Sequence, residues 1–110
     1  MKKIKANIQL INEGTKQVTG YYTEVKLETG ELAEVLIHRD YNYPDYWNVS
    51  EYATGVSITP YISDVTKAKT RKDILNLALE YTNRKLKENK MTLHEFRQGF
   101  LKSTGLHFVN

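Results

Sequence analysis

The chain has 110 residues and a net charge of +3, a length that suits one domain. It contains no cysteine, which excludes disulfides and thiolate catalysis and favours a reducing, cytoplasmic setting. No run of residues approaches the roughly 18 apolar residues of a membrane helix, and the alternating N-terminal residues do not form an export signal. We therefore expect a single cytoplasmic domain over residues 1–110.

Three strands are predicted in the first part of the chain, at residues 3–11, 16–28 and 31–39. In the first of them apolar and polar residues alternate, which is typical of a half-buried strand. The short connection between the second and third predicts a β-hairpin. The third is apolar on both faces, which indicates a central strand. Gly20, inside the second, predicts a bulge or a close approach of two backbones.

The later part of the chain predicts two short strands and two helices. The strands, at residues 47–51 and 56–61, flank a Thr-Gly turn. One helix is expected from Thr70 to about residue 87. A second begins at Thr92, which forms a capping box with Glu95, and ends before Gly105. The predicted fold class is α+β: an antiparallel meander of four or five strands, followed by two helices packed on one face.

The chemistry available for catalysis is limited. The sequence has no GxGxxG, GxxxxGK[ST] or HExxH motif, and its three histidines are scattered. One of them, His38, could act as a base only with Asp40, Asp45, Ser50 or one of the tyrosines as a partner. We favour a structural role for it, bonded to a carbonyl or carboxylate at the end of a strand. The sequence therefore predicts no enzyme, no metal and no cofactor.

The most unusual segment is residues 40–63, which holds the only Trp and five of the eight Tyr but no Lys or Arg. Some of its rings fall in predicted strands and are expected to fill the core: Trp47, Tyr52 and Tyr61. Three others flank Pro44 in a loop and are expected to be at least partly exposed: Tyr41, Tyr43 and Tyr46.

The segment is also acidic. Residues 40–64 carry four acidic side chains, whereas residues 65–110 carry ten basic and four acidic ones. Tyr and Trp dominate interface hot spots, and acidic groups attract a basic partner. We therefore predict that a protein partner, with a basic one favoured, is bound by this set: Tyr41, Tyr43, Asp45, Tyr46 and Glu51. Self-association through the same loop or through an edge strand remains open.

The alternative is nucleic-acid binding by the basic residues that lead into the first helix: Lys67, Lys69, Arg71 and Lys72. Such clusters neutralise phosphates, although lysines are also ordinary surface residues of a helix. Along the sequence the aromatic residues do not follow the pattern of an RNA-recognition sheet, which places rings beside Lys and Arg.

One run carries a resemblance to other proteins. Trp-Asn-Val-Ser-Glu-Tyr-Ala-Thr-Gly at residues 47–55, followed by a helix that opens with Thr70-Arg71-Lys72, resembles small orphan proteins of phages and mobile elements in Gram-positive bacteria. The likeness spans residues 45–86. It implies an accessory protein, a class that includes inhibitors of host defence nucleases such as anti-CRISPR proteins, and it assigns no catalytic residue. We accordingly expect a non-enzymatic binding protein.

Overall fold

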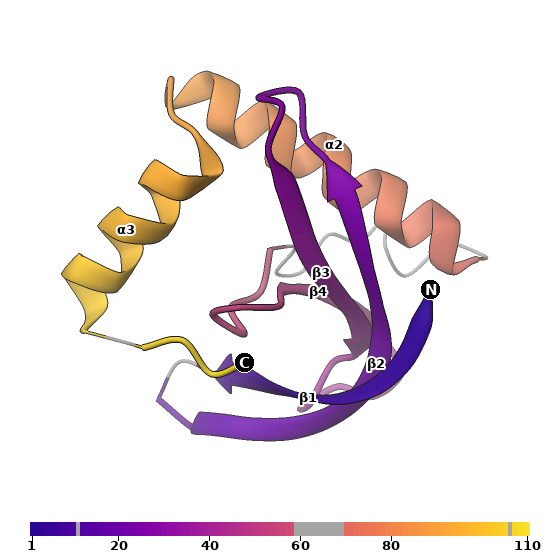
Figure 1. The fold of residues 1–110 in the computed structure, drawn as a ribbon. Coiled ribbons are helices and arrows are strands. Elements are labelled where there is room, and N and C mark those ends of the chain that lie inside the picture. Colours follow the sequence, from indigo (N-terminus) through magenta and orange to yellow (C-terminus); the bar gives the residue numbers. More distant parts are fainter. Residues whose placement is uncertain (11, 59–69, 106) are drawn as a thin grey trace.

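Over the residues that the structure describes, the fold consists of a four-stranded antiparallel meander and two helices, shown in Figure 1 as a computed structural model. The structure describes residues 1–10, 12–58, 70–105 and 107–110. The strands, in their order in the sheet, are β1 (Lys2–Leu10), β2 (Gly14–Lys26), β3 (Leu32–Arg39) and β4 (Trp47–Glu51). The helices are α2 (Arg71–Glu88) and α3 (Leu93–Thr104). The predicted α+β class is confirmed, with four strands in the sheet.

β2 bends the sheet. Its first part pairs with β1 and its second part with β3, and the two pairings overlap only at Gly20, Tyr21 and Tyr22. Gly20 is buried at this bend, where an added Cβ would lie 2.8 Å from the carbonyl oxygen of Ile37. The close backbone approach predicted at Gly20 is therefore confirmed. Because of the bend, β1 and the start of β2 curl away from β3, as Figure 1 shows.

The curled sheet is joined to itself along a seam between β1 and two distant parts of the chain. The backbone N–H of Gln9 donates to the carbonyl of Gly55 at 2.8 Å. The backbone N–H of Asn7 donates to Oδ1 of Asn110 at 2.9 Å, and Nδ2 of Asn110 donates to the carbonyl of Asn7 at 2.8 Å. In Figure 1 the C-terminal residues lie beside the end of β1. The result is an incomplete barrel.

Apolar side chains lie on both faces of β3, as its sequence predicted. On one face, here called the outer face, Val35 and Ile37 pack with Val49 of β4 and with side chains of both helices. The helix residues buried there are Ile74, Ala78, Leu86 and Leu93. On the other face, here called the inner face, Leu36 packs with Ala6 and Ile8 of β1. Both helices thus use the outer face.

Capping residues fix where each helix begins. The Oγ1 of Thr70 accepts a hydrogen bond from the backbone N–H of Asp73, which starts α2. Thr92 and Glu95 form the predicted capping box at the start of α3, and Gly105 ends that helix with a φ of 68°. None of the described helices is both long enough and apolar enough to cross a membrane.

The second strand predicted after the aromatic loop, at residues 56–61, is wrong within the residues described. Only an isolated bridge, between Ser57 and Ser50, continues the pairing beyond β4. Two backbone hydrogen bonds flank this bridge, from the N–H of Glu51 to the carbonyl of Val56 at 2.8 Å and from the N–H of Ile58 to the carbonyl of Val49 at 2.7 Å. The remainder of the predicted strand, including Tyr61, lies outside the described residues, as do Lys67 and Lys69.

Candidate functional site

The loop at residues 40–46, here called the tyrosine loop, is closed by Asp40. The backbone N–H of Asp40 donates to the carbonyl of Tyr46 at 2.8 Å. The Oδ1 atom of Asp40 accepts from the backbone N–H groups of Asn42 and Tyr43, at 3.0 Å each. A carboxylate that bonds the backbone two and three residues ahead sets the turn locally. The loop conformation therefore depends on Asp40 more than on burial of its rings.

The three tyrosines predicted to be exposed are exposed. Tyr41, Tyr43 and Tyr46 retain 46%, 55% and 50% of their surface in solvent. Tyr43 and Tyr46 also meet edge to face, with ring centroids 6.4 Å apart and an interplanar angle of 65°. Such contacts restrict ring rotation in the free protein, so these two rings would lose little conformational entropy when a partner binds.

The sequence indicates an acidic loop without basic residues, but in the structure basic side chains of β2 and β3 lie beside the tyrosine loop. The ammonium of Lys16 lies 5.7 Å from the ring centroid of Tyr41. The Nη1 group of Arg39 donates to the carbonyl of Asp45 at 3.5 Å. Asp40 is used inside the turn, so Asp45 is the acid that the loop itself presents to solvent.

Glu51 does not belong to this surface, so its predicted place in the binding set is wrong. It is 7% exposed at the far end of β4 from the loop. Its Oε2 accepts from Nε of Arg97 at 3.0 Å, and its Oε1 accepts from the hydroxyl of Thr54 at 3.0 Å. Glu51 points toward α3 because the alternation of β4 places it on the outer face with Trp47 and Val49.

Trp47 and Tyr52, the other aromatic residues of the segment that the structure describes, are half-buried. Trp47 packs against the outer core, as its predicted core role requires. Tyr52 meets Tyr22 edge to face, with centroids 5.1 Å apart, so it packs against the inner face rather than under the helices. These two rings support the fold, and the exposed aromatic surface of the segment is the tyrosine loop.

His38 is buried, and both of its ring nitrogens are bonded. Its Nδ1–H donates to the carbonyl of Arg39 at 2.7 Å, so its Nε2 is the acceptor for the hydroxyl of Ser50 at 2.8 Å. Burial lowers the pKa of His38, although the carbonyl of Arg39 and the charge of Asp40 act in the opposite direction. The pair has the geometry of a base and a hydroxyl nucleophile. Both side chains are nevertheless sealed, at 1% and 2% exposure, so no substrate can reach them.

Two stacked contacts between arginines and aromatic rings were not predicted. The guanidinium carbon of Arg39 lies 4.1 Å from the ring centroid of Trp47, and that of Arg71 lies 3.8 Å from the ring centroid of Tyr21. Each pair joins different elements. The two residues of each pair are not neighbours in the sequence, so no local pattern identified these contacts.

The outer face also has an apolar cavity of about 260 Å³ between the sheet and the two helices. Side chains that line it include Leu75, Leu79, Leu86, Leu93, Phe96 and Phe100. The Glu51–Arg97 ion pair lies in its wall. Across the described ranges, no three side chains of the His, Asp and Glu types gather closely enough to hold a metal ion.

The chain matches no protein-family model, no curated protein and no solved structure. The surfaces that remain for a functional role are the tyrosine loop and the arginine-bearing part of the outer face.

Proposed function

We propose that this chain is a non-enzymatic, cytoplasmic accessory protein that binds a protein partner through the tyrosine loop. One observation carries the proposal: Tyr41, Tyr43 and Tyr46 are each about half exposed on a turn that Asp40 closes with three hydrogen bonds. Rings that are exposed and already ordered bind with a small loss of entropy. The resemblance to proteins of phages and mobile elements supports a host defence nuclease as the partner class.

The chemistry of the loop favours a basic partner surface. The exposed carboxylate of Asp45 and the three phenol groups accept hydrogen bonds from Lys or Arg, and ring faces attract cations. Glu13 lies beside the loop, where its Oε2 accepts from Nδ2 of Asn42 at 2.9 Å. A basic partner would also have to tolerate Lys16 and Arg39, which limits the negative area to the tip of the loop.

The test compares proteins captured from a Gram-positive host lysate by the parent chain and by Tyr43→Ala/Tyr46→Ala. The matched control is Phe96→Ala, because Phe96 is also 50% exposed but lies on α3. A partner should be retained by the parent and by the control, and its affinity should fall at least tenfold for the loop variant. Equal binding by all three proteins would refute the proposal.

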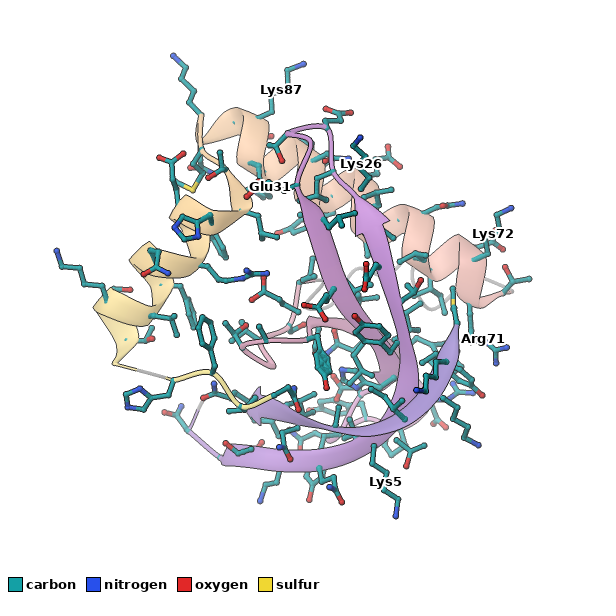
Figure 2. The ribbon with its side chains drawn as sticks, in the orientation of Figure 1. Lys5, Lys26, Glu31, Arg71, Lys72 and Lys87 are labelled. Carbon is teal, nitrogen blue, oxygen red and sulfur yellow. The ribbon has the colours of Figure 1, made fainter. Side chains whose placement is uncertain are left out.

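Nucleic-acid binding is the second candidate, and one observation favours it. Arg71 and Lys72 are exposed at the start of α2, and Figure 2 shows the side chain of Lys72 pointing away from the body. Exposed basic residues at the end of a helix can simply face solvent, so they do not by themselves identify a nucleic-acid site. Basic and aromatic side chains on the neighbouring strands provide further evidence.

A further inference from the structure

Basic and aromatic side chains from all four strands lie on one part of the outer face. In the register, Lys3 is opposite Tyr21 and Arg39 is opposite Trp47. Residues directly opposite in an antiparallel pair point to the same side of the sheet. Tyr21 is in turn opposite Ile37, which faces the outer core. These strand residues therefore share the outer face.

Two further residues complete this surface, which we call the basic-aromatic face: Lys3, Lys5, Tyr21, Arg39, Trp47 and Arg71. Lys5 follows Lys3 by one period of β1 and is exposed. Arg71 reaches the face from the start of α2, over the ring of Tyr21. Figure 2 shows Lys5 and Arg71 extending outward from these two elements.

The stacked contacts hold two arginines in place on the basic-aromatic face. The rings of Tyr21 and Trp47 are half-buried and pack against the outer core, and a guanidinium group stacks on each ring. A guanidinium held on a ring directs the N–H groups at its edge outward, where they can bind phosphate oxygens, and its planar face can stack on a base. In Arg39 one of these donors, Nη1, is already used by the carbonyl of Asp45. Arg39 and Arg71 are thus placed before any ligand arrives.

Among the residues that the structure describes, no salt bridge neutralises the positive charge of the face. The salt bridges there are Lys85–Glu88 on α2 and Arg97–Glu51, and neither includes a residue of the basic-aromatic face. On the strands, the acids of β2 and β3 alternate to the inner face, where Glu24 and Glu34 both accept from the hydroxyl of Tyr22. Glu51 of β4 shares the outer face, but it pairs with Arg97 at the far end of β4 from Trp47.

We propose that the basic-aromatic face binds single-stranded nucleic acid. Lys3, Lys5, Arg39 and Arg71 neutralise phosphates, and the Arg-aromatic stacks receive unpaired bases, which is how sequence-tolerant single-strand binders work. In a duplex the faces of the bases are stacked on one another, so a duplex could contact only the cations of the basic-aromatic face. An anionic membrane would require exposed apolar side chains, and the rings of this face are half-buried. The proposal is independent of the tyrosine loop.

Trp47 supplies a direct signal, because it is the only Trp of the chain. Adding an unlabelled oligothymidine of about 20 nucleotides should quench its fluorescence. With four phosphate contacts, the affinity should fall about 50-fold between 50 and 200 mM salt. A 20-base-pair duplex should bind more weakly, and vesicles containing phosphatidylglycerol should not bind.

The discriminating variants remove equal charge from opposite ends of the molecule. Lys3→Gln/Lys5→Gln should weaken oligothymidine binding about tenfold and roughly halve the salt dependence. Lys26→Gln/Lys87→Gln is the matched control, since Figure 2 places those residues away from Lys5, and it should bind like the parent. Arg39→Lys keeps the charge but loses the planar stack, so it should reduce Trp47 quenching and affinity together.

Several results would overturn the proposal. These are an absence of quenching at 50 mM salt, equal losses in the two lysine pairs, equal or tighter binding of the duplex, or binding of the vesicles. Tyr43→Ala/Tyr46→Ala should bind oligothymidine like the parent. A failure of the nucleic-acid proposal is therefore distinguishable from a failure of the tyrosine loop as a protein-binding surface.

Discussion

The Nε2 atom of His38 lies 2.8 Å from the Oγ atom of Ser50, and together they join β3 to β4 on the inner face. The opposite nitrogen of the ring donates to the carbonyl of Arg39 at 2.7 Å. A neutral imidazole satisfies both bonds, with one nitrogen as donor and the other as acceptor. The fold therefore holds His38 in its uncharged form.

This relationship predicts a pH dependence of stability. Burial lowers the pKa of His38 in the folded chain below the unfolded value of about 6.5, so the unfolded chain binds the proton more readily. The contribution of neutral His38 is complete above about pH 6.5 and is lost as the pH falls toward the folded pKa. Urea denaturation at several pH values from about 8 to 5 should show the fall, and His38→Gln should flatten it. An unchanged profile in the variant would contradict the assignment.

The bend of the sheet predicts opposite effects for two glycine substitutions. Gly20→Ala places a Cβ 2.8 Å from a β3 carbonyl oxygen, so the backbone must shift, at a cost of about 1–3 kcal/mol. Gly99→Ala on α3 meets no atom within 4 Å and should stabilise the helix by about 0.5–1 kcal/mol. Thermal and denaturant unfolding of both variants measures the contrast. Equal effects would mean that the bend does not depend on the close approach at Gly20.

The ion pair between Glu51 and Arg97 attaches α3 to the end of β4. Arg97→Ala leaves the buried carboxylate of Glu51 with only Thr54 as a partner, so we expect a loss of about 3 kcal/mol and faster amide exchange in α3. Lys85→Ala removes the exposed pair with Glu88 on α2 and should cost less than about 0.5 kcal/mol. Similar losses in the two variants would show that α3 is held by other contacts.

A second acidic group attaches the start of α3 to the hairpin between β2 and β3. Glu31 accepts from the backbone N–H groups of Leu93 at 2.7 Å and of His94 at 3.0 Å. Partial burial acts to raise the pKa of Glu31, but the hydrogen bonds from Thr29, Leu93 and His94 together hold it below its usual value.

A carboxyl group with a lowered pKa contributes stability above its unfolded value, about 4.3, and loses it as the pH falls through the folded value. The protection of amides in the first turn of α3, measured relative to their intrinsic exchange rates, should therefore fall below about pH 4.3. Glu31→Gln should show faster exchange already at pH 7, with a smaller change on acidification. Thr29→Ala, which keeps the carboxylate, serves as the control and should retain the acid transition.

The regular elements could be predicted because each has a local pattern. Period-two alternation identified the first three strands, and Thr92 with Glu95 identified the start of α3. Over the described residues 56–58, the predicted strand is reduced to a bridge between Ser57 and Ser50, although backbone hydrogen bonds still join Val56 and Ile58 to β4. The alternation of so short a run does not determine how many of its residues pair.

In the candidate surfaces, too, the features set by local sequence could be predicted and those set by distant contacts could not. Exposure of the tyrosine loop could be predicted because Pro44 and its polar neighbours disfavour burial. The burial of Glu51 could not, since its partner Arg97 is on α3. Likewise, the stack of Arg71 on Tyr21 joins residues far apart in the sequence, so rings that lack basic neighbours along the chain acquire them in space.

The seam between Asn7 and Asn110 has a consequence for how the chain folds. These residues are 103 positions apart, so their hydrogen bonds close a very long loop. Contacts of such sequence separation form late and slow folding. During synthesis Gln9 can bond Gly55 early, but the backbone of Asn7 lacks its partner until residue 110 has left the ribosome, and an open strand edge is the part of a nascent sheet most prone to intermolecular pairing. Cells that produce this protein slowly or at low temperature should therefore recover more of it in monomeric form.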